Sequence, residues 1–314
     1  MDWYILLIII AIFIVTSIFL ISFICFKLTF YLKNKKASDP NSIILPDDLI
    51  FKKYNDIIIR DIKEVREYPH KEYTITSFDG LKLYGKYYEN IPGAPIEIMF
   101  HGYKGSGERD LSTGVKRAFK CGRNAFLIDQ RGCGNSEGHV TSFGINERLD
   151  CQTWAYYISK EFGSETKLFL TGISMGAATV LMASALELPE NVAAILADCG
   201  YSKPSDIIKK VVKEMKLPTK VFYPFIKLGA KIFGKFDLEQ TSPYECVKHS
   251  KLPIIFIHGD NDELVPCDMS IKLYEACTSV KKLVTIHNAE HGVSYLVDPE
   301  KYIYELNNFF SEYK

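Results

Sequence analysis

The sequence has no excess of charge of either sign. Its 38 lysines and arginines equal its 38 aspartates and glutamates over 314 residues. A protein that is drawn to nucleic acid by its overall field carries a basic excess, so we expect no nucleic-acid partner. With 47% hydrophobic and 24% charged residues, the composition is instead typical of a globular protein with one large core.

Cysteine patterns that indicate metal sites or disulfide scaffolds are also missing. The eight cysteines lie far apart, with no CxxC pair and no histidine at zinc-finger spacing. A domain of this length does not need disulfides, so we interpret most of the cysteines as small buried hydrophobic residues. Structural disulfides are the alternative interpretation. We predict no metal site.

Two glycine-rich segments fall short of phosphate-binding motifs. Gly102 to Gly107 has the spacing of a P-loop, but Glu108 stands where that motif needs lysine. Gly132-Cys133-Gly134 resembles the start of a dinucleotide-binding pattern, but Glu137 occupies the place of its third glycine. We therefore predict no nucleotide and no other organic cofactor.

What the chain does have is a long apolar run at its N-terminus. Trp3 to Phe26 contains no charged residue, and about 20 apolar residues cross a bilayer as a helix. A cleaved signal peptide would carry positive charge before the run, whereas Asp2 precedes it. We predict a single-pass anchor over residues 1–26. Because lysines follow the run, the positive-inside rule places the rest of the chain in the cytoplasm. These are Lys27, Lys33, Lys35 and Lys36.

The rest of the chain divides into a connecting segment, residues 27–72, and one large domain, residues 73–314. The connecting segment begins with a polar linker, Asn34 to Asn41, and continues with an amphipathic helix from Asp47 to about Arg66. The large domain starts with a hairpin and continues with short apolar runs separated by helical stretches. The runs are residues 96–100, 124–129, 167–172, 192–198, 253–259 and 282–287.

These runs are continuous rather than alternating, as in strands that are buried on both faces of a sheet. We therefore predict an α/β fold with a mostly parallel central sheet flanked by helices. The interval of residues 200–250 is too long for an ordinary crossover and carries two amphipathic helical patterns. It predicts a helical cap inserted after the sixth strand.

The sharpest local motif is Gly172-Ile173-Ser174-Met175-Gly176. It follows an apolar run and precedes a helical pattern, which is the setting that a G-x-S-x-G nucleophile elbow requires. The serine of such an elbow occupies a strained turn, and the flanking glycines give the backbone room to form it. We predict that Ser174 is a nucleophile.

A serine hydroxyl needs a base and a group that orients the base. Carboxylates follow the run of residues 253–259, and His291 follows the run of residues 282–287. An order of serine, then acid, then histidine is the order expected of this fold. Asp260 and Asp262 are both candidates for the acid at this point.

With these motifs the sequence resembles the α/β-hydrolase superfamily from about Tyr73 to the C-terminus. The nearest likeness is to bacterial hydrolases similar to monoacylglycerol lipases and prolyl oligopeptidases. The family's acid lies in an HGxxDxxVP-like segment, and the resemblance implies Asp262 in this role. Asp260 and the more distant Asp198 are rival carboxylates. Of the histidines, His291 is preferred over His287, which we expect at a strand end in a structural role.

The oxyanion of a tetrahedral intermediate needs two backbone donors. We predict that the amide of Met175, after the nucleophile, is one of them. His101-Gly102-Tyr103 resembles the family's HG-x oxyanion loop and implies the amide of Tyr103 as the second, with His101 in a structural role. Residues 129–138 resemble the family's D-x-R-G-x-G-x-S-x-G segment, which implies a scaffold near the site.

Together these features predict a serine hydrolase that cleaves a carboxylic ester with an apolar acyl part through an acyl-enzyme on Ser174. A peptidase or amidase using the same three residues is the first alternative. A membrane-tethered binding protein without activity is an alternative of another class. The predicted partners are a small ester or lipid-like substrate and the membrane, reached through the N-terminal helix. The sequence leaves the oligomeric state open.

Overall fold

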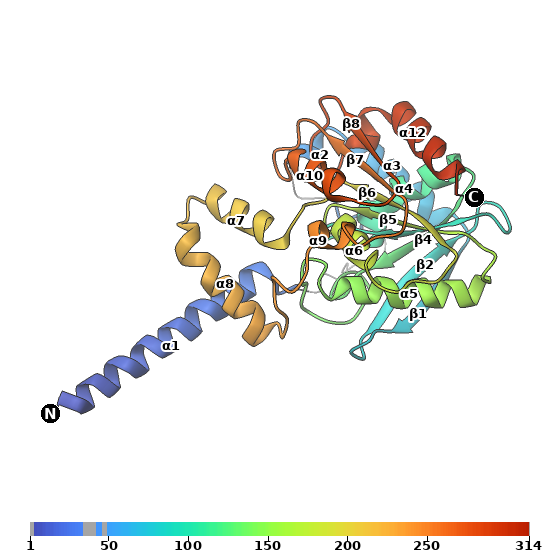
Figure 1. Cartoon of the computed structure of the whole chain (residues 1–314). Coiled ribbons are helices and arrows are strands. Elements are labelled where there is room, and N and C mark those ends of the chain that lie inside the picture. The colour runs from blue at the N-terminus through green and yellow to red at the C-terminus, as the bar shows by residue number, and fades with distance from the viewer. Residues whose placement is uncertain (1–2, 34–41, 46–48, 314) are drawn as a thin grey trace.

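A computed structural model of the chain describes residues 3–33, 42–45 and 49–313. Its centre is an eight-stranded sheet in the order β1-β2-β4-β3-β5-β6-β7-β8 (Figure 1). Strand β2 pairs antiparallel with both of its neighbours, β1 and β4, and all pairs from β4 onward in this order are parallel. The mostly parallel sheet is confirmed. The strands are β1 His70–Thr76, β2 Lys82–Tyr88, β3 Ile96–Phe100, β4 Asn124–Asp129, β5 Leu168–Ile173, β6 Val192–Asp198, β7 Ile254–Gly259 and β8 Lys281–Ile286.

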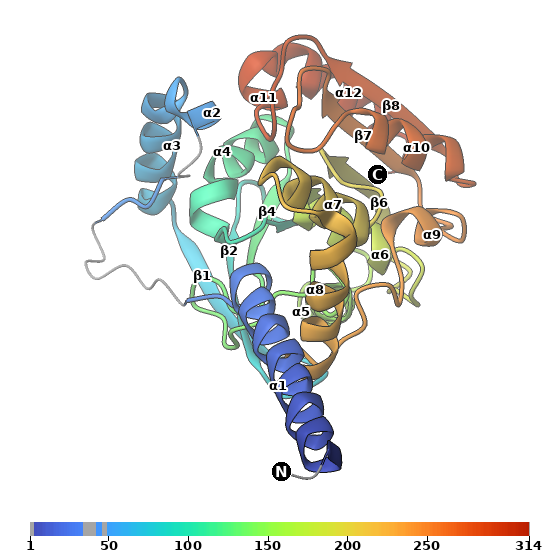
Figure 2. The same cartoon turned by 90° about the vertical axis from the view of Figure 1, so that its left-hand side faces the viewer.

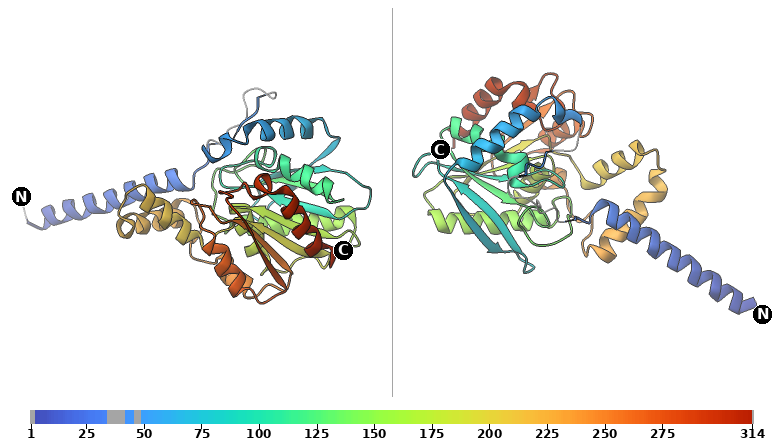
Figure 3. Two further views of the ribbon diagram at one scale, coloured as in Figure 1. Left: turned by 90° about the horizontal axis from the view of Figure 1, so that it is seen from above. Right: turned by 180° about the vertical axis from the view of Figure 1, so that it is seen from behind.

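Helices cover both faces of the sheet, as the views from above and behind show (Figure 3). They are α4 Gly107–Lys120, α5 Glu147–Phe162, α6 Met175–Ala183, α9 Pro243–Val247, α10 Asp268–Ala276, α11 Ser294–Val297 and α12 Pro299–Ser311. Successive strand residues point to opposite faces. Met99 and Leu127 therefore pack in one buried cluster with α4, while Ile98 and Phe126 pack in another with α5 and α6. This burial on both faces explains the continuous apolar runs.

Two cap helices leave the sheet between β6 and β7. They are α7 Pro204–Glu214 and α8 Thr219–Phe233, and they project beside the N-terminal helix (Figure 2). Ile207, Ile208 and Val212 of α7 are buried in the same cluster as Tyr223 and Ile226 of α8. The two amphipathic patterns of residues 200–250 thus form a small helical layer of their own.

The N-terminal part differs in detail from the predicted boundaries. Helix α1, Trp3–Thr29, continues three residues beyond the predicted anchor, and its apolar part has the length and composition of a membrane span. The single amphipathic helix expected over residues 47–66 is instead two helices, α2 Leu49–Lys52 and α3 Asn55–Glu67. Strand β1 begins before residue 73. The predicted linker Asn34 to Asn41 and the helix start at Asp47 and Asp48 lie outside the described residues.

All eight cysteines lie in the described part of the chain and all are free. Seven of them are buried, and only Cys267 is partly exposed. Their interpretation as small hydrophobic residues therefore fits the structure, and the disulfide alternative does not.

Candidate active site

Ser174 lies at a sharp turn between β5 and α6. Its φ of 54° and ψ of −115° are strained values for a residue with a side chain. The turn is possible because two glycines allow close backbone contact. A Cβ on Gly172 would collide with the backbone of Gly176, and a Cβ on Gly176 would collide with the backbone of Phe100. The predicted elbow is therefore present, with its partly buried serine at the carboxyl edge of the sheet.

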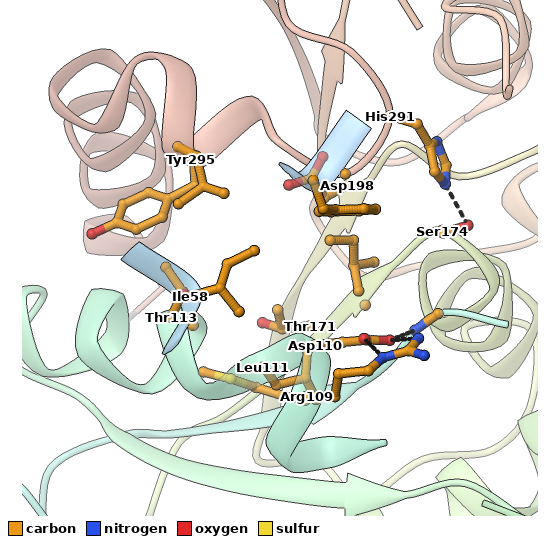
Figure 4. A pocket seen from close by; sticks show the side chains of 18 of the residues that line it. Ile58, Arg109, Asp110, Leu111, Thr113, Thr171, Ser174, Asp198, His291 and Tyr295 are labelled. Atoms are coloured by element: carbon orange, nitrogen blue, oxygen red, sulfur yellow. Dashed lines mark hydrogen bonds and ion pairs between the residues drawn. The ribbon is translucent and has the colours of Figure 1, made fainter. Parts of the chain in front are cut away.

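Ser174, His291 and Asp262 form one chain of hydrogen bonds at this edge. Nε2 of His291 lies 2.9 Å from Oγ of Ser174 (Figure 4), and Nδ1 of His291 lies 2.7 Å from Oδ2 of Asp262. Because an ionised carboxylate only accepts, Nδ1 carries the proton and Nε2 accepts from the serine hydroxyl. This arrangement orients a base toward a nucleophile. The structure brings the three residues together, and their catalytic roles remain predictions.

The carboxylate of Asp262 is held in its ionised form. Burial by itself raises its pKa, but hydrogen bonds from His258 and His291 and from the amide of Val265 outweigh this effect and lower the pKa to about 2. Asp262 is therefore negatively charged near neutral pH. A fixed negative charge beside Nδ1 stabilises the imidazolium that forms when His291 accepts a proton.

His258 is a buried partner of Asp262 that the sequence analysis did not single out. Its Nε2 lies 2.8 Å from the carbonyl oxygen of Val265 and 3.1 Å from Oδ2 of Asp262. A carbonyl only accepts, so Nε2 donates, and Nδ1 accepts from the hydroxyl of Ser270 at 2.6 Å. His258 thus fixes the orientation of the carboxylate that orients His291. The HGxxD spacing was the available signal for it.

The rival carboxylates have other partners. Asp260 pairs with His287, whose Nδ1 lies 2.9 Å from its Oδ2, at the exposed end of β8. Asp198 accepts a hydrogen bond of 2.8 Å from the hydroxyl of Tyr302, and its other oxygen has no partner among the described residues. Burial raises the pKa of Asp198 to about 6. Only Asp262, of these three, contacts His291.

The two predicted oxyanion donors lie beside Ser174. Met175 begins α6, so its amide belongs to the first helical turn, where N–H groups lack an acceptor within the helix. Tyr103 lines the same cavity as Ser174, and a Cβ on the preceding Gly102 would lie 3.7 Å from Cβ of Ser174. Asp110, which no sequence motif indicated, supports this loop by accepting from the amide of Gly102 at 3.2 Å. The donor roles stay predictions.

The side chain of Tyr103 connects the oxyanion loop to α1. Its hydroxyl donates to the carbonyl oxygen of Thr29 at 2.6 Å. Carbonyls in the last turn of a helix have no partner within the helix, so Tyr103 satisfies one of them. Its ring also packs against Phe143, with ring centroids 5.0 Å apart. No pattern in the sequence predicts this contact between segments that are 74 residues apart.

Residues of the D-x-R-G segment form hydrogen bonds to the oxyanion loop. The amide of Gln130 donates to Nε2 of His101 at 3.0 Å, and the side chain of Gln130 donates to the carbonyl of His101. Burial lowers the pKa of His101, which fits a neutral, structural histidine. Arg131 forms ion pairs with Asp150 and Asp79. These contacts agree with the scaffolding role that the resemblance implied.

A cavity of about 380 Å³ opens beside Ser174 and His291. Figure 4 shows Ser174 and His291 at one end of it and Ile58 and Tyr295 at the other. Its walls are mostly apolar, which is typical of sites for small ligands. Ile58 belongs to α3, so the segment before the large domain forms part of the cavity wall.

One group of side chains near the site has the composition of a metal site. Atoms of Cys199, Asp262 and His291 lie within 4.8 Å of one another. Burial raises the pKa of Cys199 well above its ordinary value, and Asp262 and His291 are already bonded to each other. A metal ion would have to displace that bond and remove the proton of a buried thiol. The donor set therefore fits a metal poorly.

Parts of the chain are similar in sequence to known proteins. Residues 96–242 match the family described as serine aminopeptidase, S33. YqkD, an uncharacterized protein of Bacillus subtilis (strain 168), is 25% identical over 189 residues, which cover 60% of this chain and 62% of YqkD. YNL320W, an uncharacterized membrane protein of Saccharomyces cerevisiae, is 29% identical over 165 residues, which cover 52% of each chain. The matches thus span less than two thirds of these relatives.

The fold itself has been seen in an esterase. The Pyrococcus furiosus esterase Pf2001 superposes with a TM-score of 0.67, covering 90% of this chain and 98% of the esterase at 20% identity. A likeness at this level of identity concerns the fold. The mostly parallel sheet and the sharp strand-to-helix turn at Ser174 are features of the α/β-hydrolase fold. The chain therefore has the α/β-hydrolase fold.

Proposed function

We propose that the chain is a serine hydrolase that cleaves carboxylic esters with an apolar acyl part through an acyl-enzyme on Ser174. The observation that carries this proposal is the hydrogen-bonded chain from Ser174 through His291 to Asp262, with distances of 2.9 and 2.7 Å. Three residues from three separate loops meet in the geometry that nucleophilic catalysis needs. The family described as serine aminopeptidase and the esterase of like fold support a hydrolase.

The proposed reaction has two halves. Nε2 of His291 takes the proton of Ser174 while Oγ attacks the ester carbonyl, and the amides of Tyr103 and Met175 donate to the resulting oxyanion. His291 then gives the proton to the leaving alcohol as its bond to the acyl carbon breaks. In the second half, water loses a proton to His291 and attacks the acyl carbon, and Ser174 recovers its proton as the acid leaves.

The substrate class follows from the walls of the cavity. They are mostly apolar, and Leu111 and Ile173 lie along them. An apolar acyl chain buried there gains about 0.8 kcal/mol for each methylene group. The family description instead favours an amide, which is the second candidate. Rates on p-nitrophenyl esters of increasing chain length, compared with aminoacyl p-nitroanilides, separate the two. We expect rising kcat/KM with ester chain length and little cleavage of the anilides.

The activity is tested by labelling the full chain with a fluorophosphonate probe. We expect covalent labelling and hydrolysis of p-nitrophenyl esters, both lost in Ser174→Ala. The matched control is Ser311→Ala, an exposed serine of α12, which should react like the parent chain. Labelling that persists in Ser174→Ala would exclude this nucleophile. A folded parent chain that neither labels nor hydrolyses would favour the non-catalytic binding protein.

We also propose that α1 anchors the chain in a membrane with the hydrolase domain in the cytoplasm. The helix spans 27 residues with a mean hydropathy of 3.2 over its most apolar 18-residue window, and lysines follow it. One relative in yeast is itself described as a membrane protein. A reporter enzyme fused after Lys314 should be active only on the cytoplasmic side. Activity on the opposite side would reverse the orientation.

A further inference from the structure

The second half of α1 is packed against the cap. Phe19 is exposed to roughly half of its full extent, whereas Ser22 and Phe26 are buried. Phe233 of α8 fills the space between them, with its ring centroid 5.7 Å from that of Phe19 and 5.8 Å from that of Phe26. Figures 1 and 2 both show α8 beside this end of α1. The anchor is therefore joined to the cap by a packed interface as well as by the chain.

A glycine sets the distance between the two helices. A Cβ on Gly229 of α8 would collide with the carbonyl oxygen of Ser22 and would lie 3.1 Å from Cβ of Phe26. Small residues at such a crossing let two backbones approach closely, as they do between helices inside membranes. The contact thus fixes the position along α1 at which α8 crosses it.

That position on α1 is close to the end of the apolar run, which extends to Phe26. About 20 residues of helix are needed to cross the hydrocarbon of a bilayer. Counted from Trp3, where α1 begins, this length ends at Ser22, the residue that contacts Gly229. If α1 spans a membrane, α8 therefore lies at its surface.

The faces of α8 fit that position. Val221, Phe225, Leu228 and Ile232 follow one another at helical spacing along one side, where Val221 is exposed and the other three are partly exposed. By the same spacing, this stripe borders the row of Gly229 and Phe233 that contacts α1. It therefore continues the exposed apolar surface of α1. We call these four residues the apolar stripe of α8.

Lysines occupy another side of the same helix. Lys220, Lys227 and Lys231 recur at helical spacing; Lys220 and Lys231 are exposed, whereas Lys227 is partly exposed and forms an ion pair with Glu239. An apolar stripe beside a lysine-rich face is typical of helices that lie in the interface of a membrane with anionic lipids. Each lysine near such a surface contributes about 1 kcal/mol of attraction.

We propose that α8 lies in the membrane–water interface, with its apolar stripe among the lipid acyl chains and its exposed lysines, Lys220 and Lys231, among anionic head groups. The cap is then a second contact with the bilayer besides α1. Tyr103 and Met175 pack in the same cluster as Ile226 of α8 and Phe26 of α1. These contacts connect α1 and α8 to Tyr103, which lines the Ser174 cavity. Building on the proposed function, we assign to the site lipid esters that are dissolved in the bilayer.

The position of α8 is tested with fluorescence in vesicles of equal parts phosphatidylcholine and phosphatidylglycerol. The full chain carries a thiol-reactive fluorophore at Leu228→Cys in the stripe or, as the matched control, at Lys231→Cys among the lysines. Labelling of the parent chain gives the background from the native cysteines. We expect nitroxide groups on the lipid acyl chains to quench position 228 severalfold more than position 231, and aqueous iodide to do the reverse.

Two results would overturn the proposal. Equal quenching by iodide at both positions would mean that the stripe faces water. Protection of position 228 from iodide without quenching by the lipid nitroxide would mean that protein, such as a second copy of the chain, covers the stripe. Neither result depends on catalysis, so the test stands even if the chain is no hydrolase.

The substrate class is tested by activity. Leu228→Glu places a charge in the stripe, and Tyr156→Glu, at an exposed position of α5, is the control for an acidic charge placed outside the cap. We expect Leu228→Glu to slow hydrolysis of a vesicle-borne diacylglycerol about tenfold while the rate on soluble p-nitrophenyl acetate stays unchanged. An equal loss on both substrates, or no loss on either, would contradict delivery from the bilayer. Absence of hydrolysis in the parent chain would refute the proposed function and leave the fluorescence result intact.

Discussion

Two aspartate–histidine pairs connect the loops that follow β7 and β8. Asp262 bonds to His291 at 2.7 Å, and Asp260 bonds to His287 at 2.9 Å. The side chains of the first pair are buried, with 0% and 9% exposure, whereas those of the second are 42% and 82% exposed. The two aspartates are only two residues apart in sequence and the two histidines only four, yet the two pairs occupy different environments.

The difference shows what burial adds to a hydrogen bond. Water competes for the exposed pair and screens it, so its attraction contributes little. The buried pair is out of water, and Asp262 also accepts from His258 and from the amide of Val265. These bonds keep Asp262 ionised and fix the orientation of its carboxylate. A base must be oriented before it can accept a proton from Ser174, and only the buried pair provides that orientation.

The largest contrast is expected between the two histidines. His291→Ala should lower kcat on a p-nitrophenyl ester by on the order of 10⁴ to 10⁶ because the general base is lost. His287→Ala should leave the rate within about twofold, since surface substitutions usually cost little. Steady-state kinetics on both variants measures the contrast. A large loss in His287→Ala would mean that the exposed pair takes part in the reaction.

The two aspartates should differ almost as much. Asp262→Asn is expected to reduce kcat by about 10⁴, because an amide both holds His291 in the wrong tautomer and removes the charge that stabilises its protonated form. Asp260→Asn should have little effect on kcat. The comparison is made at one pH in the range where the parent chain is most active. Similar losses in both variants would mean that Asp262 is not the only aspartate that supports His291.

A smaller effect is expected from the support behind the buried pair. His258→Leu removes a donor to the ionised Asp262, and a hydrogen bond to a charged group contributes about 1.5 to 3 kcal/mol, or roughly 10- to 150-fold in rate. We expect kcat to fall with KM unchanged, and the downfield NMR signal of the Nδ1 proton of His291 to shift. Ser270→Ala, which leaves the bond from His258 to Asp262 in place, is the control. Equal losses in the two variants would indicate a general packing defect.

The smallest effect concerns stability and a third carboxyl at this edge, Asp198. Its pKa of about 6 in the folded chain exceeds the ordinary value, so the folded state binds the proton more tightly and stability falls as the pH rises through this interval. Asp198→Asn should therefore raise stability by roughly 1 to 3 kcal/mol at pH 8 and by nothing below about pH 4. Thermal unfolding across pH measures this.

Asp260→Asn is the matched control for that experiment. The hydrogen bond from His287 lowers the pKa of Asp260, so its ionised form is favoured in the folded chain. Its replacement should not stabilise the chain at any pH. A gain at pH 8 in both variants would mean that removal of net negative charge, and not burial, is responsible.

Much of the fold was predictable because its signals are local. Continuous apolar runs indicate buried parallel strands, and the glycines around Ser174 indicate a turn that only small residues permit. The choice of Asp262 over Asp260 was less secure from residues alone, because both follow the same strand two positions apart. The resemblance implied Asp262, and the structure places it against His291.

Other parts of the site had no local signal. Asp110 supports the oxyanion loop, α3 supplies Ile58 to the cavity, and Tyr103 bonds to Thr29. Each contact joins elements that are separated in the chain and meet only after the sheet has formed. The break between α2 and α3 was also missed, because an amphipathic pattern does not reveal where a helix is interrupted.

By itself the sequence determined a parallel sheet, an elbow with Ser174, an apolar N-terminal helix and a set of candidate acids and bases. Strand burial, turn geometry and helix length are local properties that a few neighbouring residues encode. Only the tertiary structure decided which aspartate meets His291, which histidine is buried, and how α1 crosses α8 at Gly229. These outcomes depend on burial and on contacts between distant segments, which exist only when the whole chain is packed.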